Sequence, residues 1–156
     1  MAYNNFDMKN YSLILSFISL VIGISFLPSI YGQDDISKTN AKNANPIVYH
    51  LTSNDRWRSS IAISDATNLN NWGYIVTLLL SIEGVQVGVK NPHHFLNLDN
   101  VVANVTNFTK DGGKVVVCGF CLRVAGFQPN EIFDGAIIGN DEIRSKIFTN
   151  APVVTY

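Results

Sequence analysis

The amino-acid sequence predicts an α/β fold in which helices cover a parallel, five-stranded sheet. Five short apolar runs alternate along the chain with segments of helical periodicity, a pattern typical of strand–helix–strand units. The runs are largely continuous, as in residues 74–80 where Thr77 is the one polar residue, and do not alternate between apolar and polar residues. Strands of this kind are buried on both faces, as they are in parallel sheets, whose neighbouring strands need crossover connections.

Length and composition indicate one globular domain. The chain has 156 residues, of which 47% are hydrophobic. Eleven Lys and Arg residues against twelve Asp and Glu residues give a formal net charge of −1, and no basic cluster is interleaved with aromatic residues. We therefore expect no nucleic acid among its partners.

The N-terminal segment has the pattern of a secretory signal peptide. An uncharged apolar run, residues 13–27, follows Lys9, and it is shorter than the roughly 20 residues that a membrane span needs. We expect residues 1–32 to be a signal peptide and the protein to be exported to a periplasmic, pseudoperiplasmic or extracellular space. For cleavage after Gly32, Ile30 stands at the minus-three position, where a small residue is preferred. The alternative is therefore that the signal is not cleaved and that residues 13–27 anchor the protein in the membrane. No other contact with a membrane is expected.

Residues 33–45 are polar and show no apolar period, so they are expected to form a flexible linker before a domain of residues 46–156. The expected strands are the apolar runs of that domain: residues 47–51, 74–80, 115–117, 136–138 and 153–156.

The first helix is expected to begin at Ser53, Asn54 or Asp55, whose side chains can cap free N–H groups, and to break at Asn70 and Asn71.

The second helix is indicated by apolar residues at intervals of three and four: Phe95, Leu98, Val101, Val102, Val105 and Phe108. The glycine-containing segment 111–113 should end it. A short helix should follow Cys118 and end at Gly126, and a last helix should span residues 141–148.

Candidate site residues gather where the strands end. Ligand sites of open α/β sheets lie beyond the carboxyl ends of the strands, and this rule places His50, residues 81–85, Cys118 and Gly119 on one edge. The loop of residues 83–89 contains Gly84 but lacks both the dinucleotide fingerprint and the P-loop pattern. No nucleotide or other cofactor is therefore expected.

Both cysteines of the chain, Cys118 and Cys121, lie where the third apolar run becomes a helix. Free backbone N–H groups at a helix start stabilise a thiolate, which makes Cys118 the first nucleophile candidate. Cys121, one helical turn later, can lie on the same face and resolve an adduct on Cys118. The alternative is an inert thiol pair or a structural disulfide, because cysteine is among the most buried residue types.

A metal site would need His50, His93 or His94 beside the cysteines. Because His93 and His94 are adjacent, their side chains point in different directions and lack the paired spacing of zinc ligands. We expect no metal.

The segment Val-Val-Cys-Gly-Phe-Cys-Leu-Arg-Val-Ala-Gly-Phe at residues 116–127, the strand order and the turn at residues 83–85 resemble the DsrE/DsrF-like family of sulfur-relay proteins. The strongest element of the resemblance is a cysteine that ends a strand eight residues before a glycine, here Cys118 and Gly126. The resemblance covers residues 46–156. It implies a flavodoxin-like three-layer sandwich, assembly as a homotrimer or homohexamer, and persulfide carried on Cys118.

This chain departs from the family pattern in two features: the export signal, and Glu83 where relatives often have histidine or another polar residue.

Two functions remain open from the sequence. The first is a sulfurtransferase or persulfide carrier in which Cys118 and Cys121 are catalytic and His50, Glu83, Gly84 and Gly119 lie at the edge of the site. Its partners would be sulfur donor and acceptor proteins or small sulfur species. The second is an oligomeric module that binds a small ligand or serves as a scaffold, with structural cysteines. A thioredoxin-like reductase is a weaker third hypothesis, because its motif follows the first strand of a differently ordered fold.

Overall fold

Residues 45–156 are described by a computed structural model of the chain. The predicted signal segment, residues 1–32, and all of the predicted linker except Asn45 lie outside the described residues. Within residues 45–156, no helix is both long enough and apolar enough to cross a membrane.

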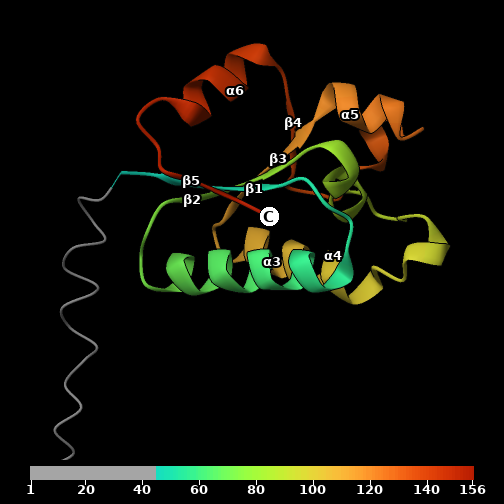
Figure 1. Cartoon of the computed structure of the whole chain (residues 1–156), viewed down its shortest axis with the longest axis horizontal. Helices are drawn as coiled ribbons and strands as arrows, with labels where there is room; N and C mark the ends of the chain where they lie inside the picture. Colours follow the sequence, from blue (N-terminus) through green and yellow to red (C-terminus); the bar gives the residue numbers. More distant parts are fainter. Residues whose placement is uncertain (1–44) are drawn as a thin grey trace, which may run out of the picture. The chain divides into compact units, whose positions relative to one another are not determined.

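The centre of the domain is a five-stranded sheet in which every paired neighbour is parallel (Figure 1). The spatial order is β4-β3-β2-β1-β5. The strands are β1 (Ile47–Leu51), β2 (Val76–Leu80), β3 (Lys114–Cys118), β4 (Ile137–Gly139) and β5 (Val153–Thr155). The predicted α/β fold with a parallel five-stranded sheet is confirmed.

Helices lie on both faces of the sheet. Helices α3 (Arg56–Asn71) and α4 (Asp99–Lys110) cover one face, and α6 (Asp141–Phe148) lies on the other (Figure 1). Side chains alternate between the faces along each strand. The larger core lies on the α3 and α4 side and includes Leu78, Leu80, Val115 and Val117. The smaller core joins Val48, Leu79 and Val116 to Ile143, Ile147 and Phe148 of α6.

Helix α3 begins as predicted but ends later. The Asp55 side chain accepts a hydrogen bond from the backbone N–H of Arg58 at 2.9 Å, which caps the helix. The expected break at Asn70 and Asn71 is wrong, because the helix runs through both residues. The Asn70 side chain donates to the Asp111 carbonyl at 2.9 Å, so this asparagine is held by a tertiary contact and does not end the helix.

Helix α4 begins later than the apolar spacing predicts. Phe95 is 83% exposed and lies in the short 3₁₀ helix η2 (His94–Leu96), outside α4. Asn97, with φ of 51°, separates the two helices. The buried stripe of α4 therefore starts at Leu98, and the assignment of Phe95 to that stripe is wrong.

The helices after β3 and β4 match the expectation. Helix α5 (Gly119–Val124) follows Cys118 directly and is capped at Ala125, and Gly126 follows with φ of 89°. The Asn140 side chain accepts from the backbone N–H of Ile143 at 2.8 Å, which fixes the start of α6.

The glycine-containing segment after β2 is a buried 3₁₀ helix, η1 (Ile82–Gly88), where a loop was expected. Gly84 makes this possible. A Cβ at this position would lie less than van der Waals distance from the Leu51 carbonyl oxygen at the end of β1. The Gly84 N–H donates to the carbonyls of Ser81 at 2.9 Å and Thr52 at 3.2 Å, so η1 closes directly over the end of β1.

We predict that Gly84→Ala lowers the free energy of unfolding by about 1–3 kcal/mol or more, because the obstacle is backbone and cannot rotate away. Glu83→Ala, a neighbouring exposed position, should change it by no more than about 0.5 kcal/mol. Urea unfolding of the two variants measures both values, and equal stability of the two would contradict the close approach of η1 to β1.

Candidate functional site

The carboxyl ends of three neighbouring strands carry the candidate residues. Leu80 of β2 pairs with Leu51 of β1 and with Val117 of β3. Ser81 is therefore level with Cys118, and His50, which pairs with Leu79, lies two positions earlier on β1. The parallel register thus brings the ends of β1, β2 and β3 to one edge, as the sequence predicts.

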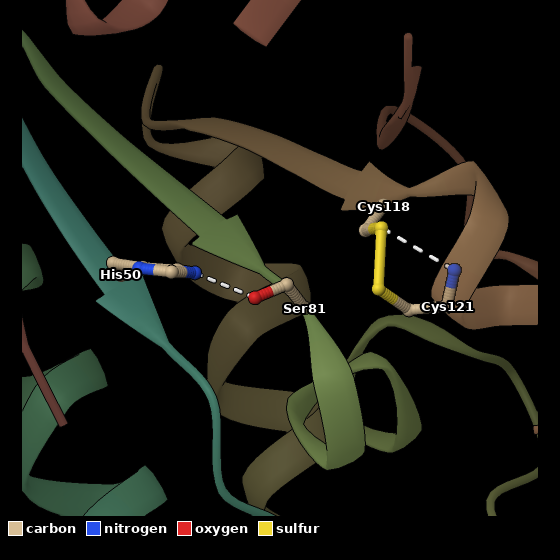
Figure 2. The surroundings of a disulfide bond; sticks show 4 residues. All are labelled: His50, Ser81, Cys118 and Cys121. Atoms are coloured by element: carbon tan, nitrogen blue, oxygen red, sulfur yellow. Dashed lines mark hydrogen bonds between the residues drawn. A yellow bond between two sulfur atoms is a disulfide. The ribbon is translucent and has the colours of Figure 1, made fainter. Parts of the chain in front are cut away.

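Cys118 and Cys121 form a disulfide at this edge (Figure 2). Their Cα atoms are 5.3 Å apart, within the range that a disulfide spans. Cys118 is the N-cap of α5, and its Sγ accepts the backbone N–H of Cys121 at 3.3 Å. Cys118 is only 5% exposed, whereas Cys121 is half-buried. An incoming group therefore meets the Cys121 sulfur more readily.

His50 and Ser81 form a hydrogen-bonded pair on the strands next to the disulfide. His50 Nε2 lies 2.5 Å from Ser81 Oγ, and Ser81 follows β2, the strand between those of His50 and Cys118 (Figure 2). The His50 ring also packs edge-on against Phe148 of α6. Burial and, to a lesser extent, the positive charge of Arg144 lower the pKa of His50 from its ordinary value. The imidazole is therefore neutral at pH 7.

A pocket of about 540 Å³ opens between the disulfide and the start of α6. Both cysteines line it, together with Arg123 of α5 and Arg144 of α6. Gly119 lies in its floor, where a Cβ would come within 2.9 Å of the Ile138 side chain. We call this pocket, with these residues, the arginine pocket.

A second pocket, of about 360 Å³, lies on the other side of Cys121. We call it the apolar pocket, because exposed hydrophobic side chains dominate its lining. It is lined by Ile82, Phe120, Val124, Ala125, Cys121, Asn54, Glu83 and Gln86. Phe120 and Cys121 line both pockets, so the disulfide lies on the ridge between them.

The backbone of Ile82 is strained at the edge of the apolar pocket. Its φ of 54° is in the left-handed region, which β-branched residues rarely adopt. Such a conformation costs roughly 1–3 kcal/mol and is found most often at functional sites. The Ile82 side chain is 62% exposed, so its own packing offsets little of this cost. Contacts of the neighbouring residues must therefore hold the backbone of Ile82 in this conformation.

The other sequence-predicted site residues have distinct positions. Glu83 is exposed and lines the apolar pocket, and Gly84 is buried beneath the end of β1. His93 packs on Phe127 and is hydrogen-bonded to Gln86, and it lines neither pocket. Within residues 45–156, no three His, Cys, Asp or Glu side chains lie close enough together to bind a metal ion.

Sequence reasoning missed Arg144 and the strained backbone of Ile82. Arg144 belongs to a helix more than 20 residues after the cysteines, and only the return of α6 across the sheet brings it to the arginine pocket. Ile82 lies in the segment 81–85 that the sequence places at this edge, but no local pattern predicts its left-handed conformation, because isoleucine is unfavourable at positive φ.

Comparison with known proteins identifies the fold. No protein-family model and no curated protein matches the sequence. MTH1491, a protein of unknown function from Methanobacterium thermoautotrophicum, superimposes with a TM-score of 0.61 and 17% identity over 72% of this chain and 100% of its own length. The YchN protein from E. coli superimposes with a TM-score of 0.53 and 17% identity, with the same coverage. This chain therefore has the same fold as these two structures, an α/β fold with a five-stranded, all-parallel sheet and helices.

We predict that the imidazole of His50 titrates below its ordinary pKa of 6.5 in the folded protein. The unfolded chain then binds the proton more readily, so the contribution of His50 to stability is full above pH 6.5 and is lost as pH falls from there toward the lower folded pKa. NMR titration of the histidine ring measures the midpoint. Arg144→Gln should raise it part of the way, because burial is the larger cause. A midpoint at or above the ordinary value would contradict this environment.

Proposed function

We propose that the protein is a sulfur carrier that holds persulfide on Cys118 and releases it through Cys121. The observation that supports this most strongly is the position of the two cysteines, which form a close pair at the carboxyl end of β3 between two pockets. Pockets at this edge are where α/β sheets bind ligands, and a thiol that is close to a partner thiol can be resolved after it takes up sulfur.

Sulfur uptake requires the reduced pair. The Cys118 thiolate attacks the terminal sulfur of a persulfide or polysulfide donor, the donor's S–S bond breaks, and the donor leaves as a thiolate or a shorter polysulfide. The N–H of Cys121, which already points at the Cys118 sulfur, stabilises the attacking thiolate.

Sulfur release regenerates the disulfide. The Cys121 thiolate attacks the Cys118 sulfur, the persulfide bond breaks, and hydrosulfide leaves. An external thiol then returns the two electrons. It attacks the more exposed Cys121 sulfur and frees Cys118 as a thiolate, and a second thiol resolves the mixed disulfide.

His50 is assigned as the base of the site. A neutral imidazole at pH 7 can accept a proton, and its hydrogen bond to Ser81 extends toward the strand of Cys118. Glu83 and Gly119 are assigned to the walls of the two pockets.

The proposed setting is outside the cytoplasm. The signal-like segment of residues 13–27 supports export, and a cysteine pair that rests as a disulfide suits an oxidising compartment. We also propose a homotrimer or homohexamer. The resemblance of residues 116–127 to the DsrE/DsrF-like family supports this assembly.

A second candidate function is the binding of a small apolar ligand, with a structural disulfide. The apolar pocket supports it, because its volume of about 360 Å³ is within the range of small-molecule sites. The two candidates differ in the reactivity of the cysteines.

We predict that the reduced protein, incubated with polysulfide, gains the mass of one or more sulfur atoms in intact mass spectrometry, and that Cys118→Ser abolishes the gain. Cys121→Ser is the matched control. It removes the resolving thiol, so the adduct on Cys118 should form and persist longer than in the wild type.

Two results would reject the carrier function. One is a folded wild-type protein that gains no sulfur and whose reduced thiols react with an alkylating agent only after unfolding. The other is a sulfur adduct that Cys118→Ser leaves unchanged. The first result would favour the ligand-binding module, and the second would place the reactive thiol at Cys121.

A further inference from the structure

Two arginine side chains from different helices meet the cysteine pair in the arginine pocket. Arg123 comes from α5 and Arg144 from α6. The ion pairs between side chains of the described part of the chain are Lys90–Asp134 and Lys146–Glu142, so neither arginine has a carboxylate within 4.0 Å there. The positive charge of both guanidinium groups is therefore available to a ligand.

Both guanidinium groups are directed toward the disulfide edge. Arg123 Nη1 lies 3.9 Å from the position that a Cβ on Gly119 would occupy, so it extends back over the residue that follows Cys118. The charge of Arg144 reaches His50 on β1 and lowers its pKa. Asp141 is the one carboxylate in the lining, and it is exposed. The two positive charges of the arginines outnumber this one negative charge.

We propose that the arginine pocket binds a small sulfur oxyanion of the sulfite class, whose oxygens the two guanidinium groups hold while its sulfur attacks the disulfide. This inference rests on the proposed function, because sulfite can open the Cys118–Cys121 bond only if that bond is exchangeable. The new element is the class of small molecule that opens the bond.

The chemistry of arginine favours an oxyanion over a neutral thiol. A guanidinium group presents a planar set of N–H donors that matches two oxygens at once, and it stays charged at every physiological pH. A pocket of about 540 Å³ is within the range of small-molecule sites and larger than a sulfite ion requires, so the anion can enter and orient there.

The reaction balances without a further reagent. The sulfur lone pair of sulfite attacks the Cys121 sulfur and forms a new S–S bond, and the Cys118–Cys121 bond breaks. The bonding electrons leave on Cys118 as a thiolate, which accepts the N–H of Cys121. The sulfite sulfur is oxidised, the Cys118 sulfur is reduced, and the products are an S-sulfonate on Cys121 and the thiolate that the carrier function needs.

The test uses the oxidised full-length protein and sulfite as the probe. Intact mass spectrometry of samples quenched with an alkylating agent follows two species, the sulfonate adduct and the freed thiol. Dithiothreitol is the parallel reagent, because it attacks as a thiolate with a single charge on sulfur and has no oxyanion group for the guanidinium groups to hold. The variant is Arg123→Gln with Arg144→Gln, and the matched control is Arg56→Gln with Arg58→Gln. The control removes the same charge from α3, which lies on the opposite face of the sheet from α6 (Figure 1).

We expect the pocket variant to open about tenfold more slowly than the wild type with sulfite, as the loss of two partly screened charges near an anion implies. Its rate with dithiothreitol should fall much less, because the attacking thiolate has a single charge and no oxygens for the guanidinium groups to bind. The control should match the wild type with both reagents. Added salt should slow the wild-type reaction with sulfite, because it screens the guanidinium charges.

The two proposals fail in different ways. If dithiothreitol opens the wild-type disulfide and sulfite opens the wild type and the pocket variant equally fast, the oxyanion site is wrong and the carrier function stands. If the pocket variant slows equally with both reagents, the arginines have a structural role and the oxyanion site is again wrong. If neither reagent opens the disulfide in the folded wild type, both proposals are wrong.

Discussion

The parallel pairing of β1, β2 and β3 is the constraint on which the rest of the site depends. Because all three strands run the same way and Leu80 is in register with both Leu51 and Val117, their carboxyl ends meet at one edge. Residues far apart in the sequence, His50, Ser81 and Cys118, become neighbours there. The helices that return from this edge supply its walls: α5 carries Cys121 and Arg123, and α6 carries Arg144. A slip of one residue in β2 would turn Ser81 to the opposite face and separate it from His50.

The cysteine pair has different surroundings on its two sides. Toward α6 it borders two arginines without carboxylate partners among the described residues, and toward η1 it borders exposed apolar side chains held by the strained turn at Ile82. The buried sulfur of Cys118 receives a backbone N–H, whereas the sulfur of Cys121 is more accessible. In the exchange that we propose, this asymmetry gives the two sulfurs separate roles: Cys121 is the point of attack, and Cys118 is the stabilised leaving group. A purely structural disulfide needs neither an accessible sulfur nor a charged pocket beside it.

Much of this architecture follows from local patterns in the sequence, but the site only in part. Largely continuous apolar runs predicted the buried strands β1, β2 and β3, and the expected start of the last helix at residue 141 and the end of α5 before Gly126 are confirmed. The runs that form β4 and β5 also become strands, but β4 is only partly buried and β5 is exposed, because β4 and β5 lie at the two edges of the sheet. Two helix boundaries were predicted wrongly. Asn70 does not end α3, because a tertiary hydrogen bond holds its side chain, and Phe95 does not belong to α4, because the left-handed Asn97 separates it from that helix. The rule that ligands bind beyond strand ends brought His50 and Cys118 together from sequence alone. Arg144 could not be placed in this way, since its position depends on how α6 packs across the sheet.

The proposed function requires a Cys118–Cys121 bond that is exchangeable rather than structural. A redox titration of the folded protein against thiol–disulfide buffers measures the reduction potential of this bond, with the reduced fraction trapped by alkylation and counted by mass. An exchangeable pair should have a reduction potential between about −270 and −120 mV. A potential below about −300 mV, typical of structural disulfides in secreted proteins, would show that the bond is structural.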